Sequence, residues 1–270
     1  MRLKNMVNFK LRLKQSLSLA APGLLLAGML SGCATPPPKS SVEDYQAYKQ
    51  LNDPLEPTNR VFYKVNNTLD QYAMKPVAKG YVHITTQPIR NHVSNFVANI
   101  SEPERLVNFM AEGQSRDAGT SLVRFLLNST VGIGGIFDPA AALGYPKTDT
   151  DFAMTLAIWG VPPGPYLYLP VFGPSGVRDA LNYPAEMYAT PMYAAPETDA
   201  LDDFGYAETG LHLINSRAAY LQPIDQIQAT ALDPYATFRS LYRQSRDSEV
   251  QQIYDRNKLT PPDWVQTPKQ

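Results

Sequence analysis

The sequence predicts an all-α fold built from short amphipathic helices. Apolar side chains recur at helical spacing in several segments, and proline and glycine separate these segments from one another. Proline accounts for 24 of the 270 residues, well above its usual share of about 5%, which favours many short elements over a few long ones. No segment shows the sustained alternation of a strand, and residues 166–171 come nearest to it.

The composition excludes several classes of protein. Hydrophobic residues make up 44% and charged residues 18% of the chain, which is enough to form a core. A formal net charge of −1 argues against nucleic acid as a partner, because such proteins carry a basic surface. The single cysteine excludes a disulfide framework, and the three histidines lie too far apart to suggest a metal site. We therefore predict no metal and no cofactor.

The N-terminus, residues 1–32, is predicted to be a cleaved export signal. Five basic residues precede a 14-residue apolar stretch, which is shorter than the roughly 20 residues that span a bilayer. Residues 30–33, which read LSGC, resemble the bacterial lipobox, in which signal peptidase II cuts before the cysteine and the thiol then carries diacylglycerol. We predict that Cys33 is lipidated, the alternative being an ordinary buried or free cysteine. Ala34, rather than aspartate, implies sorting to the outer membrane.

The remainder of the chain is predicted to form one domain between two polar segments. Residues 33–50 form the acylated N-terminus and a linker, in which the run PPPKSS has the stiff, solvated character of polyproline. Residues 51–247 form the helical domain, and residues 248–270 form a polar C-terminal tail.

Local signals mark where the helices of this domain begin. Asp53 and Pro54 are typical of an N-cap followed by a first helical residue, and Pro76 is predicted to end that run. Pro88 is predicted to begin the next helix. Ser101 and Glu104 have the spacing of a capping box for a third helix.

Gly113 is predicted to end this third helix, and Ser115 to cap the one that follows. In that following helix Leu122, Phe125 and Leu126 are expected to face the core. Residues 199–221 are helical by composition, and Asp233 with Pro234 signals the start of the last helix.

The middle of the chain, residues 152–177, contains 26 residues without a charge, together with four glycines and five prolines. So many helix breakers exclude a continuous membrane-spanning helix. Uncharged, broken backbone is tolerated at membrane depth only inside protein or around a cavity. A buried loop of a soluble domain is the alternative interpretation, but the lipid anchor predicted at Cys33 favours a segment at membrane depth.

Enzyme motifs are missing from the sequence. Ser175 does not stand in a Gly-x-Ser-x-Gly nucleophile elbow and is predicted instead to cap a helix beginning at Gly176. Residues 132–135 lack the third glycine of a dinucleotide fingerprint, and no His-Glu-x-x-His motif occurs. Asp149 and Asp151 are expected to be caps or solvated residues. We therefore predict no catalytic residue and no enzymatic activity.

A series of motifs resembles, in order, the MlaA/VacJ family of outer-membrane lipoproteins. Residues 52–60 read NDPLEPTNR, and residues 75–81 read KPVAKGY. The central motifs are RFLLNSTVGIGG at 124–135, FDPA at 137–140 and GPYLYLP at 164–170. The last helix carries DPY at 233–235 and RSLYR at 239–243. The resemblance spans roughly residues 50–247, nearly the whole predicted domain.

The resemblance implies an all-α, ring-shaped assembly of short amphipathic helices with a Gly/Pro-rich hairpin, embedded in the periplasmic leaflet of the outer membrane. In this family the ring surrounds an amphipathic channel through which misplaced outer-leaflet phospholipids descend. The implied partners are a trimeric porin that holds the ring, the periplasmic lipid carrier MlaC and, indirectly, the inner-membrane ABC transporter MlaFEDB. The implied location is the periplasmic side of the outer membrane of a Gram-negative bacterium, with a lipid anchor.

By the same resemblance, the hairpin that gates the channel falls within residues 152–177. The gate candidates are Phe152, Trp159, Gly160, Gly164, Tyr166 and Val177. Gly160 and Gly164 are expected to be flexible points, and Trp159 and Tyr166 to lie at the membrane–water boundary. Where the family has a glycine, this chain has a proline pair at 162–163, which makes the hinge stiffer.

Two classes of function remain open on the sequence. The favoured hypothesis is a non-enzymatic conduit for phospholipid that maintains outer-membrane lipid asymmetry. The alternative is a structural or interaction lipoprotein of the outer membrane that supports envelope integrity or surface contact in virulence, and a lipid-hydrolysing enzyme comes third. Neighbouring genes for a lipid ABC transporter and a periplasmic carrier would favour the conduit.

Overall fold

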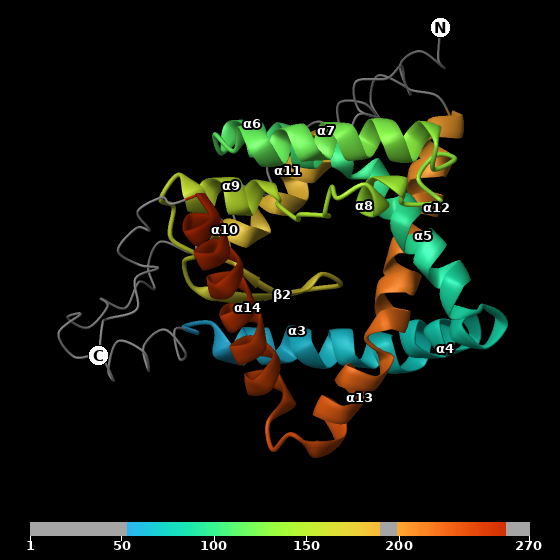
Figure 1. Ribbon diagram of the computed structural model, residues 1–270. Helices are drawn as coiled ribbons and strands as arrows, with labels where there is room; N and C mark the ends of the chain where they lie inside the picture. The colour runs from blue at the N-terminus through green and yellow to red at the C-terminus, as the bar shows by residue number, and fades with distance from the viewer. Residues whose placement is uncertain (1–52, 190–198, 258–270) are drawn as a thin grey trace, which may run out of the picture. The chain divides into compact units, whose positions relative to one another are not determined.

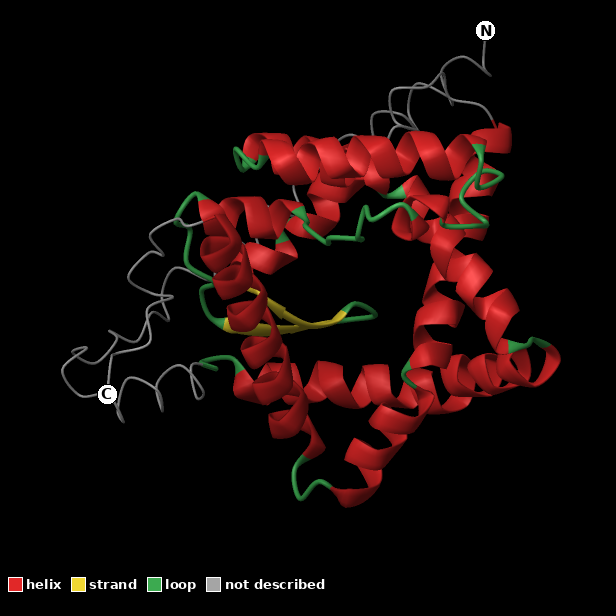
Figure 2. Ribbon diagram, in the orientation of Figure 1, coloured by secondary structure: helices red, strands yellow, loops and turns green. Residues whose placement is uncertain are grey.

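The computed structural model describes residues 53–189 and 199–257 of the chain, so Cys33 and the linker lie outside the described residues. The chain divides after Pro54, and the architecture given below belongs to the unit Leu55–Gln270. The described part of this unit is largely helical, with one small antiparallel sheet (Figure 2), which confirms the predicted all-α class. None of the described helices is both long enough and apolar enough to cross a membrane.

Two helices form the first part of the unit. Helix α3 spans Glu56–Leu69, the π-helical turn η1 spans Asp70–Met74, and α4 spans Lys75–Ile84. Helix α3 begins later than predicted, because its N-cap is Leu55 rather than Asp53. Leu55 makes no side-chain capping hydrogen bond, and a proline stands in the first turn of the helix. The prediction that Pro76 ends the helix is also wrong. Pro76 lies in the first turn of α4, where the wider π-turn before it accommodates the missing N–H donor.

Three helices follow: α5 over Gln87–Ile100, α6 over Glu102–Ala111 and α7 over Ser115–Thr130. The predicted start near Pro88 and the end before Gly113 are confirmed. The capping box is not formed, because Ser101 has helical backbone angles and its hydroxyl donates to the carbonyl oxygen of Val97 at 3.3 Å. Ser115 is the first residue of α7 rather than its cap, and no side chain caps that helix.

The uncharged middle of the chain forms one helix and a hairpin. After the short α8 (Pro139–Ala142), α9 spans Phe152–Ile158, and β1 (Tyr166–Leu169) pairs antiparallel with β2 (Gly173–Gly176). Strand β1 confirms the predicted extended segment. Ser175 lies in β2, where its hydroxyl donates to the carbonyl oxygen of Gly176, so the prediction that it caps a helix is wrong. The short α10 (Val177–Ala180) and α11 (Asn182–Ala189) follow.

The C-terminal part consists of α12 (Asp199–Ala219), α13 (Leu221–Thr230) and α14 (Pro234–Asn257). Asp233 caps α14 as predicted, because its carboxylate accepts the amide N–H of Ala236 at 3.2 Å. Helix α14 does not stop at residue 247, where the polar tail was predicted to begin. Val250 and Tyr254 are buried against Met154 of α9, so the helical domain extends to residue 257.

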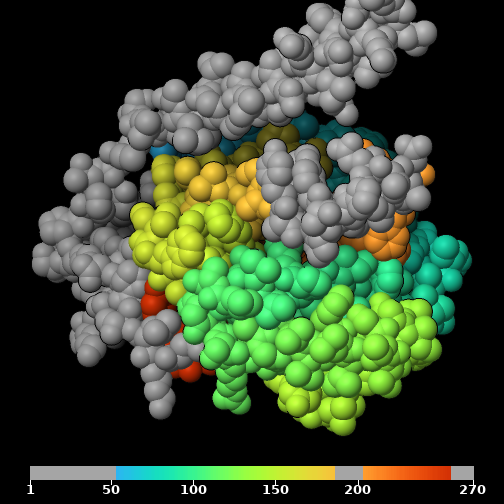
Figure 3. Space-filling model, turned by 90° about the horizontal axis from the view of Figure 1, so that it is seen from above, coloured from blue at the N-terminus to red at the C-terminus, as the bar shows by residue number. Residues whose placement is uncertain are grey.

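The helices contact one another in a closed circuit, which agrees with the predicted ring (Figure 1). Helix α4 packs on α12, α12 on α5, α5 on α7 and α7 on α6. Seen from above, α6 and α7 lie side by side and form one broad surface (Figure 3). The circuit continues from α6 to α9 and α14, and the hairpin joins α14 back to α3, since β2 contacts α14 and β1 contacts α3.

Candidate functional site

The predicted gate segment begins with α9 and continues through a glycine-rich loop. Phe152 is the first residue of α9, and its amide donates to the side-chain oxygen of Asn182 at 2.9 Å. Trp159 is 60% exposed, and its indole N–H donates to the carbonyl oxygen of Ala111 at 3.0 Å. Gly160 has a φ of +92°, and a β-carbon there would meet no atom within 4 Å. The loop after α9 therefore has open space beside it.

The second half of the segment is more tightly packed. Gly164 has a φ of +70° and lies against Val177, whose Cβ would be 3.1 Å from a β-carbon added at Gly164, so these two gate candidates are in contact. Tyr166 is only 1% exposed and packs in an aromatic cluster with Tyr168 and Tyr235. The expectation that Tyr166 lies at the membrane–water boundary is therefore wrong, because its ring is part of the core.

Arg178, which follows the hairpin, holds the proline-containing loop. Its guanidinium donates to the carbonyl oxygen of Val161 at 3.3 Å, and its amide donates to that of Pro163 at the same distance. The side chain is buried and forms an ion pair with Asp179 at 2.9 Å. Through these contacts Arg178 anchors the loop.

Helix α7 buries its polar face and exposes its apolar face. Leu122 and Leu126 are 44% and 53% exposed, so the prediction that they face the core is wrong. The buried face carries Asp117, Ala118, Ser121, Arg124 and Asn128, which follow one another at helical spacing.

The same reversed arrangement occurs on other helices. On α3, the exposed residues include Val61, Val65 and Leu69, whereas the buried residue is Asn59. On α6, Val107 and Met110 are exposed while Glu102 and Asn108 are buried, together with the ring of Phe109. The loops add further exposed apolar side chains: Val131, Ile133, Phe137, Leu143, Val171 and Phe172.

Such a surface is unfavourable in water. Soluble monomers rarely expose large contiguous apolar patches, and they seldom bury charged side chains. In hydrocarbon the preference is reversed, since apolar side chains are stable there and ionisable ones turn toward the protein interior. The distribution of side chains on α3, α6 and α7 is therefore typical of helices whose outer faces lie against lipid.

The buried charges are paired with one another. The guanidinium of Arg124 lies 2.8 Å from the carboxylate of Glu102 and 3.0 Å from that of Asp138, and it also donates to the carbonyl oxygen of Tyr145. Ser121 donates its hydroxyl to the second oxygen of Glu102 at 2.9 Å. The network satisfies each of these charges, which is what makes their burial tolerable. It joins α6, α7 and the loop before α8.

A second network joins α14 to the gate segment. Arg246 contacts Asp151, which caps α9, at 3.0 Å and Asp179 at 3.1 Å. Burial opposes ionisation of Asp179, but the positive charges of Arg246 and Arg178 outweigh it and lower the pKa of this carboxyl. Asp151 is thus a cap, as predicted, and it also fixes the start of α9.

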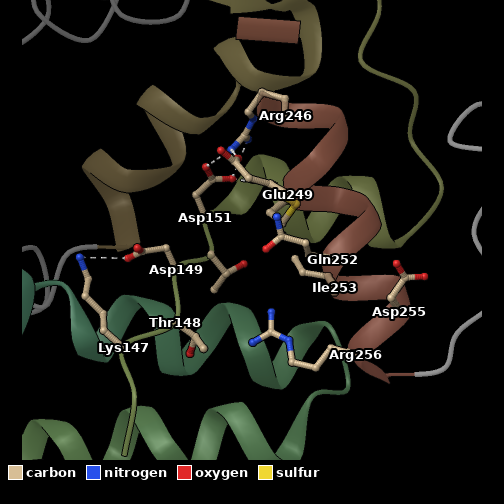
Figure 4. Close-up of a pocket in the computed structure, with 12 residues that line it drawn as sticks. Lys147, Thr148, Asp149, Asp151, Arg246, Glu249, Gln252, Ile253, Asp255 and Arg256 are labelled. Carbon is tan, nitrogen blue, oxygen red and sulfur yellow. Dashed lines mark hydrogen bonds and ion pairs between the residues drawn. The ribbon is translucent and has the colours of Figure 1, made fainter. Parts of the chain in front are cut away.

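A polar cavity of about 680 Å³ lies beside this network (Figure 4). Its charged side chains pair largely with one another, as Lys147 does with Asp149 at 3.4 Å and Arg246 with Glu249 at 2.9 Å. Among the described residues, no cluster of histidine, cysteine and carboxylate side chains could hold a metal ion. The lining residues are Lys147, Thr148, Asp149, Thr150, Asp151, Met154, Arg246, Glu249, Gln252, Ile253, Asp255 and Arg256.

Glu112, at the end of α6, is a buried carboxylate that contacts α9. It accepts the hydroxyls of Thr155 at 3.0 Å and of Thr150 at 2.5 Å, and Gln114 donates to its other oxygen. Burial raises the pKa of Glu112 to about 7, although the two hydroxyl groups oppose this effect. No motif in the sequence pointed to this residue.

Comparison with known proteins identifies relatives that match most of this chain. Residues 51–249 match the MlaA lipoprotein family. The "Intermembrane phospholipid transport system lipoprotein MlaA" of Escherichia coli (strain K12) is 34% identical over 247 residues, which cover 87% of this chain and 88% of that protein. The protein of the same name from Haemophilus influenzae is 30% identical and covers 84% of this chain and 88% of the relative.

Two further comparisons extend this result. An uncharacterized protein of Rickettsia bellii is 35% identical over 215 residues, which cover 79% of this chain and 82% of that protein. A solved structure described as the "Structural basis for maintenance of bacterial outer membrane lipid asymmetry" superposes with a TM-score of 0.63 at 30% identity, covering 73% of this chain and 98% of the solved one. The sequence and the fold lead to the same assignment: this chain belongs to the MlaA lipoprotein family.

Proposed function

We propose that this chain removes mislocalised phospholipids from the outer leaflet of the outer membrane and passes them to a periplasmic lipid carrier. The observation that carries the proposal is the reversed amphipathicity of α3, α6 and α7, with apolar side chains outward and ion pairs inward. A ring with such an outer surface is stable within a membrane leaflet, and its polar interior offers a path for a charged headgroup. The names of the Escherichia coli and Haemophilus influenzae relatives support the same activity.

The proposed location is the periplasmic side of the outer membrane, with Cys33 as the acylated N-terminus. Several acyl chains on one residue hold a protein at a bilayer far more firmly than a single chain does. The apolar outer faces would then set the depth of the helical unit in the leaflet. Intact-mass analysis of the purified chain tests the anchor, since the absence of an acyl mass on Cys33 would contradict it.

The proposed mechanism involves no catalysis. Transfer of a phospholipid between leaflets or to a carrier breaks no covalent bond, so it requires a path and a gate rather than a nucleophile. The proposed partners are a trimeric porin that holds the ring, the carrier MlaC and, through that carrier, the inner-membrane transporter MlaFEDB. Residues 152–177 are proposed as the gate, because they combine the exposed Trp159 and the open Gly160 with a packed hairpin.

The test is the phospholipid content of the outer leaflet. Intact cells that carry or lack the gene are treated with a membrane-impermeant reagent for amines, and labelled phosphatidylethanolamine is quantified. We expect more labelled lipid in the deletion strain and a return to the original level on complementation. Equal labelling in both strains would refute the proposal, and it would favour the alternative of a structural or interaction lipoprotein if envelope integrity were nevertheless lost.

A further inference from the structure

Two asparagines of α3 hold the main chain of the hairpin. The side-chain amide of Asn59 donates to the carbonyl oxygen of Tyr166 at 3.1 Å, and its oxygen accepts the amide N–H of Tyr168 at 2.9 Å. Asn66 repeats this pattern with Leu169 and Val171, at 2.8 and 2.9 Å. Asn59 therefore bonds to β1 as the backbone of a neighbouring strand would, and Asn66 does the same where β1 ends and the turn begins.

The spacing of the two asparagines matches the spacing of their targets. Asn59 and Asn66 are seven residues apart, so they lie on one face of α3 and are separated by about 10.5 Å along its axis. Their targets on β1 are shifted by three residues, which corresponds to about 10 Å along a strand. Both side chains can therefore bond at once, the second where β1 ends and the chain turns at Val171, and a one-residue slip of β1 would break all four hydrogen bonds.

The second asparagine contacts a strained residue. Val171 has a φ of +71°, which is rare for a β-branched residue. Such a conformation persists only where the surroundings impose it, and it often marks a functional segment. Val171 is 70% exposed in the turn between β1 and β2, where the pairing of Leu169 with Gly173 and the hydrogen bond to Asn66 both restrain it. In Figure 2 this turn points into the frame formed by the helices.

We infer that Asn59 and Asn66 form a clamp that makes α3 and the hairpin one body, and that Asn66 positions the turn at Val171 and Phe172 in the lipid path. The inference rests on the proposed function for the existence of that path, but not for the existence of the clamp. It locates gate movement outside β1, at Gly160, which has open space beside it and precedes the part of the loop that Arg178 holds. Asn59 and Asn66 are thus positioning residues.

The clamp is tested by a distance measurement. The full chain, with Cys33 exchanged for serine, receives spin labels at cysteines replacing Lys64 on α3 and Phe172 in the turn, and electron double resonance gives the distance distribution between them. We expect a narrow distribution in the parent and a broader one in Asn66→Leu. Asn66→Asp keeps the acceptor for the amide N–H of Val171 but loses the donor to the carbonyl oxygen of Leu169. The width of its distance distribution should therefore lie between those of the parent and Asn66→Leu.

Asn67→Leu is the matched control. Asn67 is the neighbouring asparagine on α3, and its side chain accepts from Gln228 of α13 at 2.6 Å instead of bonding to the hairpin. This variant should keep the narrow distribution. Circular dichroism verifies that all variants keep their helix content. An unchanged distribution in folded Asn66→Leu, or equal broadening in Asn67→Leu, would refute the clamp whatever the function of the protein.

The positioning role is tested in cells with the same variants, without labels. We expect Asn66→Leu to raise labelled outer-leaflet phosphatidylethanolamine toward the level of the deletion strain, and Asn67→Leu to leave it unchanged. A broadened distance distribution with wild-type lipid labelling would overturn the positioning role while the proposed function stands. If deletion of the gene does not change the labelling, the proposed function itself fails, and the distance measurement alone then decides whether the clamp exists.

Discussion

Replacement of Arg124 by methionine should strongly destabilise the protein. Arg124 and Glu102 are 2% and 1% exposed, and their charged groups lie 2.8 Å apart. Without the guanidinium, the buried carboxylate keeps only the hydroxyl of Ser121 and a more distant contact with Arg105 at 3.6 Å. Removing one partner of such a pair typically costs about 3–5 kcal/mol. At roughly 2–4 °C per kcal/mol for a domain of this size, the melting temperature should fall by about 6–20 °C.

The assay is thermal unfolding of the detergent-solubilised protein, followed by far-ultraviolet circular dichroism. Arg116→Met is the matched control, because Arg116 is an exposed arginine on the same helix, and it should change stability by less than about 0.5 kcal/mol. The double variant Glu102→Leu with Arg124→Met should recover much of the loss, since an apolar pair of similar volume often replaces a buried ion pair without cost. If Arg124→Met is as stable as the control Arg116→Met, or if the double variant is no more stable than Arg124→Met, this reasoning is refuted.

Three further predictions concern Glu112, two glycines and the gate. Because the pKa of Glu112 is raised to about 7 from an ordinary value of 4.5, the folded state binds the proton more tightly, and stability should fall by up to about 3 kcal/mol as the pH rises from 4.5 to 7. Glu112→Gln should abolish this dependence in melts across that range, and an equal slope in both proteins would contradict it. Gly132→Ala places a β-carbon 2.5 Å from two backbone oxygens and should prevent stable folding, whereas Gly80→Ala meets nothing within 4 Å and should stabilise α4 by up to about 1 kcal/mol. Gly160→Asp should raise surface-labelled phospholipid, because it puts a charge beside lipid tails, whereas Gly160→Asn, which strains the backbone at φ +92° in the same way, should raise it less. Wild-type labelling in a folded, correctly localised Gly160→Asp variant, or equal labelling in both variants, would mean that the gate lies elsewhere.

Local chemistry in the sequence was sufficient to predict where several elements begin. The start near Pro88, the end before Gly113 and the cap at Asp233 depend on residues next to one another in the chain, and the structure confirms all three. Two local signals failed because the neighbouring backbone has another conformation than the one predicted. Ser101 joins two helices directly instead of capping one, and Pro76 follows a π-turn that accommodates it.

The orientation of the helices could not be predicted from apolar spacing alone. The periodicity of Leu122 and Leu126 identifies a helix face, but the surrounding medium decides whether that face points inward or outward. The polar spacing of Ser121, Arg124 and Asn128 marks the opposite face of the same helix, and it leaves the orientation open in the same way. Residue spacing therefore identified the helix correctly and assigned its faces the wrong way round.

The contacts of the hairpin could not be predicted from the sequence either. Asn59 lies more than a hundred residues from Tyr166, and no local pattern indicates that its amide bonds to a strand. Strand β2 consists of Gly-Pro-Ser-Gly, which has little strand propensity and is extended only because β1 pairs with it. Burial of Tyr166 follows from the same long-range packing, since its neighbour Tyr235 comes from α14.

The central claim is that hydrocarbon, not water, covers the outward faces of the helices, and quenching of a fluorescent label tests it most directly. The chain, with Cys33 exchanged for serine, is labelled at a cysteine replacing Leu126 on α7 or Gln252 on α14 and reconstituted into vesicles. Leu126 lies on the exposed apolar face, and Gln252 lines the polar cavity. We expect phospholipids with brominated acyl chains to quench the label at Leu126 and aqueous iodide to quench the label at Gln252. Quenching at Leu126 by iodide as strong as at Gln252, with no effect of brominated lipid, would contradict the claim.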